Sequence, residues 1–193
     1  MARARLLIVC TILYFLAGCG PSGAPWHATN ITGDMPKLEF SMTRASDGAA
    51  VTGRDYLGRV TLVFFGYTNC PDVCPATLAN LADVLKRLGP DAGKVRVLFV
   101  TVDPGRDTLP VLKAYAAAFA PQVDGLRGTG NALASLARRY RVAYSVKTEP
   151  VYEVMHTSAV FFFDAEGRAR LVTLSTEDTA GLAEDVKRLI DGE

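Results

Sequence analysis

The stretch VTLVFFGYTNCPDVCPATLANLADVLKRL, residues 60–88, joins a strand pattern to a helix pattern through two cysteines. Val60–Gly66 is a continuous β-branched and aromatic run, which is typical of a central strand buried on both faces. Ala76–Leu88 repeats leucines three and four residues apart, which predicts an amphipathic helix that ends at the following Gly-Pro pair. Cys70 and Cys74 lie between the two elements.

The rest of the chain alternates strand and helix patterns in the same way. We predict strands at Leu38–Met42, shortly before Asp55 and at Val95–Val102, helices at Leu109–Phe119 and Ala132–Tyr140, a hairpin of Ala159–Phe163 with Arg170–Leu174, and a last helix at Glu177–Ile190. This order indicates an α/β fold with a central mixed β-sheet flanked by helices. Ligands of such sheets bind just beyond the carboxyl ends of strands, which is where the cysteines lie.

Composition limits the class of protein. The chain has 193 residues, of which 49% are hydrophobic and 21% charged, as expected of one compact domain with a substantial core. Its net charge is +1 and it contains no long basic run, so we expect no nucleic-acid partner.

The N-terminus has the layout of an export signal. Arg3 and Arg5 precede the apolar stretch Leu6–Leu16, which is shorter than the roughly 20 residues that a membrane-spanning helix needs. The sequence LAGC, ending at Cys19, resembles the lipobox of bacterial lipoproteins. We therefore expect a lipoprotein signal peptide over residues 1–18 and lipidation of Cys19, which would hold the protein on a membrane of the bacterial cell envelope, facing the periplasm or another extracytoplasmic space. An uncleaved anchor, or an ordinary signal with an incidental cysteine, is the alternative.

The segment after Cys19 is rich in Gly, Pro, Ser and Thr and lacks periodicity. It predicts a flexible tether over residues 19–37, in which His27 is solvated, followed by a folded domain over residues 38–193.

The two cysteines suit either redox or metal chemistry. Pro71 and Pro75 favour a loop or the first turn of a helix, and the N-terminus of a helix favours thiolate over thiol. If the segment is helical, four residues separate the two Cα atoms by about 6 Å. That spacing fits a disulfide, which accepts about 4.4–6.8 Å, and it also lets both sulfurs reach one metal ion. Local geometry leaves both interpretations open.

His156 is the candidate third ligand. It lies just before the predicted strand at residue 159, whereas the other histidine, His27, lies in the predicted tether. Two thiolates and one imidazole suit Cu(I), and zinc is the competitor, although structural zinc sites usually take four protein ligands. In an extended segment Met155 points to the opposite face from His156, so we interpret Met155 as core filler rather than a fourth ligand.

Three blocks of sequence resemble the Sco/SenC family of copper chaperones, which has a thioredoxin-like fold. They are GYTNCPDVCP at residues 66–75, VDPGRDT at residues 102–108 and the late His156. The resemblance implies that Cys70, Cys74 and His156 bind one copper ion and that Asp72 and Asp103 lie near it. Met155 departs from the aspartate that many members have before the histidine. Considered without the family, Asp103 begins a turn, and Asp107 or Thr108 caps the next helix.

The resemblance also implies a function. It predicts a membrane-anchored metallochaperone that delivers copper to the copper A centre of cytochrome c oxidase subunit II, or reduces the cysteines of that centre beforehand. Other copper chaperones or thiol reductants are then further partners. The alternative is a thiol-disulfide oxidoreductase of thioredoxin type, against which stands the C-x-x-x-C spacing in place of C-x-x-C. A third hypothesis is an exported copper or redox sensor.

Overall fold

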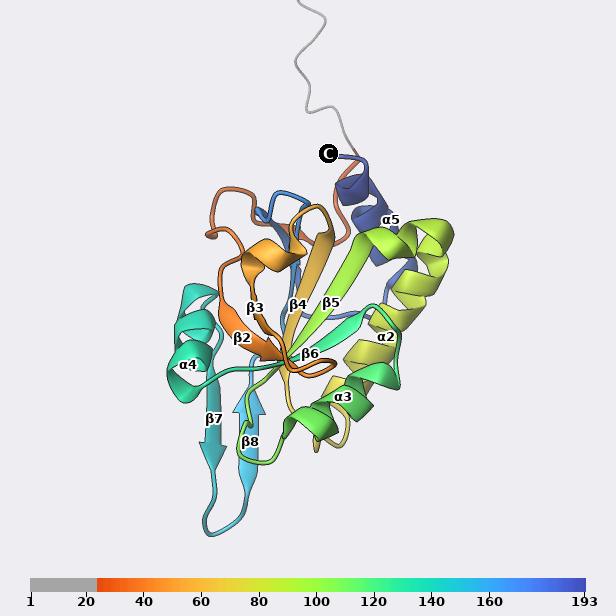
Figure 1. The fold of residues 1–193 in the computed structure, drawn as a ribbon. Coiled ribbons are helices and arrows are strands. Elements are labelled where there is room, and N and C mark those ends of the chain that lie inside the picture. Colours follow the sequence, from red (N-terminus) through yellow and green to blue (C-terminus); the bar gives the residue numbers. More distant parts are fainter. Residues whose placement is uncertain (1–23) are drawn as a thin grey trace, which may run out of the picture.

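A computed structural model describes residues 24–193 and places a mixed sheet at the centre of the domain (Figure 1). The strands are β1 (Thr29–Asn30), β2 (Ser41–Arg44), β3 (Ala50–Thr52), β4 (Val60–Gly66), β5 (Val95–Thr101), β6 (Val123–Arg127), β7 (Tyr144–Lys147), β8 (Glu153–His156), β9 (Val160–Phe163) and β10 (Ala169–Thr173). The helices are α2 (Val73–Leu88), α3 (Leu109–Ala117), α4 (Gly130–Arg139) and α5 (Thr179–Ile190), with short 3-10 helices at Gly53–Tyr56 and Gly89–Lys94.

The main sheet has the strand order β1-β10-β9-β4-β5-β6-β2-β3. Strands β4, β5 and β6 run parallel, whereas every other pairing in this sheet is antiparallel. The predicted α/β fold with a central mixed sheet is confirmed.

Helices cover both faces of this sheet. Buried residues of α2, α3 and α5 pack on one face, and those of α4 pack on the other. Strand β4 serves both cores, because Leu62 and Phe64 face the first while Val63 and Phe65 face the second. This position explains the unbroken apolar run of the strand, whose carboxyl end leads directly into the cysteine segment.

The predicted tether is wrong for its second part. Strand β1 pairs with β10, Ala28 is buried, and Trp26 packs against the core, with the Arg188 guanidinium of α5 3.8 Å from the centre of its ring. The backbone N–H groups of His27 and Ala28 donate to the buried carboxylate of Asp185 at 3.1 and 2.7 Å. Residues 24–37 therefore belong to the folded domain, because backbone pairing and burial fix them even though their sequence lacks periodicity.

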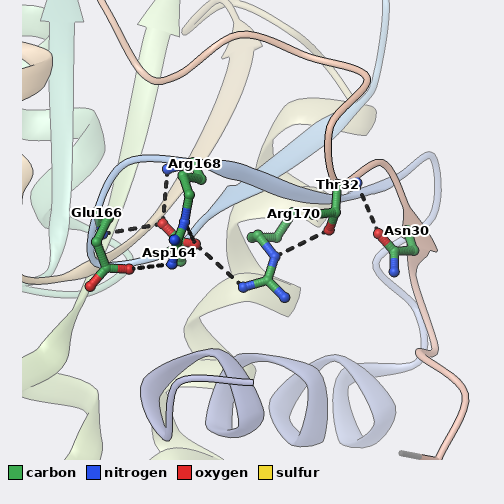
Figure 2. Close-up of polar contacts among 6 residues, drawn as sticks. All are labelled: Asn30, Thr32, Asp164, Glu166, Arg168 and Arg170. Carbon is green, nitrogen blue, oxygen red and sulfur yellow. Dashed lines mark hydrogen bonds and ion pairs between the residues drawn. The ribbon is translucent and has the colours of Figure 1, made fainter. Parts of the chain in front are cut away.

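Polar side chains also hold this N-terminal segment against the β9–β10 turn (Figure 2). The Arg170 guanidinium donates to the hydroxyl of Thr32 at 3.1 Å and lies 3.3 Å from the buried carboxylate of Asp164. Asp164 in turn accepts the backbone N–H of Arg168 at 2.8 Å, which closes the turn. The segment is thus tied to the sheet at both its backbone and its side chains.

Besides β1, which lies in the predicted tether, three strands were not predicted. Strand β6 carries Asp124 and Gly125, which interrupt its apolar pattern. Strands β7 and β8 form a separate two-stranded sheet, with Tyr144 opposite His156, and most of their side chains are exposed or half-buried. Figure 1 shows this β7–β8 hairpin projecting from the end of the domain away from the C-terminus.

Two further predictions concern the membrane. Among the helices of residues 24–193, none combines the length and apolar character needed to cross a bilayer. The predicted signal peptide, residues 1–18, and the predicted lipidation site Cys19 lie outside the described residues.

Candidate metal centre

Three side chains from separate elements meet at the carboxyl end of β4. Cys70 lies in the loop after β4, Cys74 in the first turn of α2 and His156 at the end of β8. Their ligand atoms, two Sγ and one imidazole nitrogen, all lie within 4.8 Å of one another. Both cysteines are free thiols. The fold thus brings together the three residues that the sequence singled out.

The sulfur of Cys74 occupies space that a glycine leaves open. Cys74 is fully buried in the first turn of α2, which starts at Val73, three positions before the predicted start at Ala76. A Cβ atom at Gly66 would lie 2.8 Å from Cys74 Sγ and 2.6 Å from the Phe99 ring, closer than real contacts allow. Gly66 therefore lets the helix start against the end of the strand.

The two thiols differ in acidity. Burial by itself raises the pKa of Cys70, but hydrogen bonds from the backbone N–H groups of Asp72 and Cys74 outweigh it, so the pKa falls below the usual value. The Cys74 N–H donates to Cys70 Sγ at 3.4 Å. Burial raises the pKa of Cys74, and a backbone hydrogen bond from Tyr67 offsets this only in part. We therefore expect Cys70, a half-exposed sulfur beside a helix N-terminus, to be the more reactive thiol.

The His156 imidazole is held with one nitrogen toward the sulfurs. Its Nε2 lies 3.4 Å from Cys74 Sγ, and its Nδ1 lies 3.1 Å from the carbonyl oxygen of Thr157. Burial lowers the pKa of His156, which favours the neutral ring. In that form Nδ1–H donates a hydrogen bond to the Thr157 carbonyl, which leaves the Nε2 lone pair directed at the sulfurs. The rings of Phe64 and Tyr67 meet the imidazole edge-on, and the centre of each ring lies 5.9 Å from the centre of the imidazole.

A buried carboxylate fixes the start of the cysteine loop. Asp107 accepts hydrogen bonds from the Thr68 N–H at 3.1 Å, the Thr68 hydroxyl at 2.6 Å and the Thr101 hydroxyl at 2.6 Å. Helix α3 begins after Thr108, whose side chain makes no capping bond. The expected position of the cap is thus confirmed for Thr108, although no side-chain hydrogen bond accompanies it, and Asp107 is not the cap because its carboxylate is directed at the cysteine loop.

The two aspartates that the resemblance placed near the metal occupy different positions. Asp72 is exposed at the start of α2 and lines the same surface hollow as Cys70 and His156. Asp103 is buried with 1% of its surface exposed, and it bonds to Arg106 and Tyr152 rather than to the three candidate ligands. The expected turn at Asp103 is present, since its carbonyl accepts the Arg106 and Asp107 N–H groups.

Met155 is not core filler, so that interpretation is wrong. Its side chain is 58% exposed, and it lies on the rim of the hollow that contains Cys70 and His156. Exposure alternates along β8, which confirms that Met155 and His156 point to opposite faces of the strand. The strand is at the surface, so its outward face has no core to fill.

The donor set can perform two kinds of chemistry. Two sulfurs and a neutral imidazole form a soft, three-coordinate site that suits Cu(I). The same two sulfurs can instead be oxidised to a disulfide, which removes both from metal binding. Sequence reasoning missed the residues that shape the site, above all Gly66 and Tyr67. A glycine that ends a strand directly before the cysteines was the one signal available.

Comparisons with known proteins agree with this geometry. The family model described as SCO1/SenC matches residues 31–191. The bovine mitochondrial SCO2 homolog is 37% identical over 185 residues, which cover 86% of this chain and 67% of that protein. The structure of Bradyrhizobium japonicum ScoI with copper bound is 36% identical, with a TM-score of 0.72, and covers 79% of this chain and 98% of the other.

A third comparison is with BsSco, described as a member of the Sco family of cytochrome c oxidase assembly proteins with a disulfide switch. It is 26% identical, with a TM-score of 0.66, and covers 84% of this chain and 99% of the other. The match covers 39% of the length of the Arabidopsis SCO1 homolog and 46% of that of the mouse SCO1 homolog, so the chain spans less than half of each. The match over residues 31–191, with these structures as neighbours, confirms the thioredoxin-like Sco fold and shows that the chain belongs to the SCO1/SenC family.

Proposed function

We propose that this protein is a copper-binding metallochaperone of cytochrome c oxidase assembly, with Cys70, Cys74 and His156 as its copper ligands. The observation that carries the proposal is the convergence of two sulfurs and one imidazole nitrogen within 4.8 Å. Copper is cargo rather than a resident cofactor in this proposal.

The donor set favours copper over the other common metals. Thiolate and imidazole ligands exclude magnesium and calcium, and a closed zinc site would need a fourth protein ligand. Within residues 24–193, no fourth Cys, His, Asp or Glu joins the three in a metal-binding group. The copper-bound structure of a 36% identical relative supports the same choice.

The acceptor is the copper A centre of cytochrome c oxidase subunit II in this proposal. A Sco protein described as an oxidase assembly protein is 26% identical to this chain, which supports a role in the same process. Lipidation of Cys19 would hold the domain on the extracytoplasmic face of a membrane, where the acceptor also lies. Copper would pass by ligand exchange, as acceptor thiolates replace Cys70, Cys74 and His156 in turn.

Reduction of the acceptor's cysteines is the second candidate function. The unequal pKa values and exposures of the two thiols favour it, because an accessible thiolate beside a buried thiol suits attack followed by resolution. The Cys70 thiolate would attack an acceptor disulfide and form a mixed disulfide. Cys74, after losing its proton, would then displace the acceptor thiolate. The products are an acceptor dithiol and a Cys70–Cys74 disulfide, a balanced exchange of two electrons.

A copper titration of the reduced full chain tests the first proposal. The wild type should bind one Cu(I) per chain, in competition with a chromophoric Cu(I) chelator, and His156→Ala should bind at least about 10-fold more weakly. His27→Ala is the matched control, because it removes the other histidine of the chain and should bind copper as the wild type does. Equal affinity in the wild type and His156→Ala would contradict the three-ligand site.

The same variant separates the two candidate functions. Thiol exchange requires only the cysteines, so His156→Ala should still reduce a disulfide peptide from an acceptor while its copper affinity falls. Loss of both activities in His156→Ala, with the fold intact, would contradict the assignment of separate roles to the histidine and the sulfurs.

A further inference from the structure

His156 reaches the metal centre on a hairpin that is only loosely attached to the domain. Strands β7 and β8 pair with each other and with no strand of the main sheet among the described residues. The side chains of Tyr144 and Val154 pack against the core, but Val146, Val151 and Met155 are exposed. Something must therefore fix the direction in which the hairpin presents its histidine.

One polar contact ties the far half of the hairpin to the main sheet. The Tyr152 hydroxyl, just before β8, donates to the Asp103 carboxylate at 2.7 Å. For residues 144–155, this is the one side-chain hydrogen bond to another part of the chain that the structure of residues 24–193 contains. Asp103 follows β5 and Cys70 follows β4, so the bond joins the hairpin to the carboxyl ends of the central strands, where Cys70 also lies.

Arg106 completes this contact. Its Nε donates to the second carboxylate oxygen of Asp103, and its guanidinium carbon lies 3.7 Å from the centre of the Tyr152 ring. The Oδ1 of the buried Asp103 carboxylate thus has a short bond from the hairpin and a longer one, 3.4 Å, from the Arg106 N–H, while Oδ2 has its donor from the β5–α3 loop. If the hairpin moved away, Asp103 would lose a donor that water could replace only by entering a buried position.

The contact continues to the third ligand. The Arg106 guanidinium also lies 5.9 Å from the centre of the Tyr67 ring, and that ring meets the His156 imidazole edge-on at 5.9 Å and 83°. Tyr67 directly precedes the cysteine loop. Arg106 thus lies between an aromatic ring of the hairpin and one that packs on the ligand itself.

We propose that Asp103, Arg106 and Tyr152 are positioning residues that dock the β7–β8 hairpin and so hold His156 against the two cysteines. This inference rests on the proposed copper function and adds residues that touch no metal. With the hairpin docked, copper has three ligands. With the hairpin released, two sulfurs remain, so docking sets how tightly the copper is held and how readily it passes to an acceptor.

A double-mutant cycle on Cu(I) affinity tests whether these residues act through His156. Tyr152→Phe removes the hydroxyl but keeps the ring over Arg106, and in the reduced full chain it should weaken Cu(I) binding by about 5- to 10-fold. In the His156→Ala background the same change should alter the affinity by less than about 2-fold, since the ligand it positions is gone. Tyr144→Phe, an equivalent change on the paired strand, is the control and should leave affinity unchanged.

A copper-free measurement keeps this inference distinct from the proposed function. Diethyl pyrocarbonate modifies neutral imidazole, and peptide mass spectrometry separates the two histidines of the chain. Tyr152→Phe should speed modification of His156 by about 3-fold or more while His27 reacts as in the wild type. A wild type that binds no copper would overturn the proposed function. The positioning role would be overturned if Tyr152→Phe left the reactivity of His156 unchanged. It would also be overturned if Tyr152→Phe weakened Cu(I) binding equally in the wild-type and His156→Ala backgrounds.

Discussion

The cysteine half of the proposed metal centre and its histidine half are built in different ways. Cys70 and Cys74 belong to the connection between β4 and α2, a buried strand and a helix of the main core. His156 belongs to a hairpin that is largely exposed and outside the main sheet. The difference fits the proposed site, with a fixed sulfur pair and a third ligand that can be withdrawn, and such a site would suit the proposed role of holding and releasing copper.

Removal of a sulfur should have the largest effect. Cys74→Ser places a hard hydroxyl in the buried position and leaves one thiolate, so Cu(I) affinity should fall by more than about 100-fold. Chelator competition on the reduced full chain measures this. His156→Ala should lose less Cu(I) affinity than Cys74→Ser. The reverse order would contradict a fixed sulfur pair with a separable histidine.

Loss of the hydrogen bonds that Asp107 makes to the cysteine loop should lower the stability of the protein. Asp107→Asn replaces one carboxylate oxygen by an NH2 donor, which faces either the Thr68 hydroxyl on the Oδ1 side or the Thr68 N–H and the Thr101 hydroxyl on the Oδ2 side, so the free energy of unfolding should fall by about 1–3 kcal/mol. Chemical denaturation of the metal-free protein measures the change. Asp34→Asn is the control, because Asp34 is exposed and should tolerate the change. Equal stability of the two variants would show that Asp107 does not anchor the loop.

Thiol reactivity should differ within the cysteine half. The pKa of Cys70 lies below its usual value and that of Cys74 above it, so at about pH 7.5 iodoacetamide should modify Cys70 at least about 10-fold faster in the reduced, copper-free chain. As the pH rises, Cys70 becomes fully deprotonated before Cys74 does, so the ratio of the two modification rates should fall. Peptide mass spectrometry measures both rates, and denaturant should abolish the difference. Faster modification of Cys74 would contradict the assignment.

Replacement of Met155 should have the smallest effect. Its side chain is exposed and on the opposite face of β8 from His156, so Met155→Leu should change Cu(I) affinity by less than about 2-fold. The same competition titration measures it. A loss of 10-fold or more would mean that the thioether joins the ligands and that the hairpin supplies two of them.

The two halves also differed in how far the sequence predicted them. The apolar run of β4 and the leucine spacing of α2 are local patterns, so the place of Cys70 and Cys74 followed from neighbouring residues. Strands β7 and β8 have little core to cover, so their hydrophobic period is weak, and the hairpin that carries His156 went unpredicted. The histidine was found by its chemistry and by the family resemblance rather than by its fold.

Residues that support the site were harder to predict because their partners are distant in sequence. Asp107 bonds to Thr68 across 39 positions, and Tyr152 bonds to Asp103 across 49. The local turn at Asp103 was predicted correctly, but no periodic pattern shows which side chain meets its carboxylate. The same limit applied to residues 24–37, where pairing with β10 decides the structure.

Copper K-edge X-ray absorption of the copper-loaded, reduced full chain tests the ligand set most directly. We expect a first shell of two sulfurs and one imidazole nitrogen in the wild type, and loss of the imidazole signal in His156→Ala with both sulfurs retained. A first shell without sulfur, or an imidazole signal that persists in His156→Ala, would contradict this ligand set.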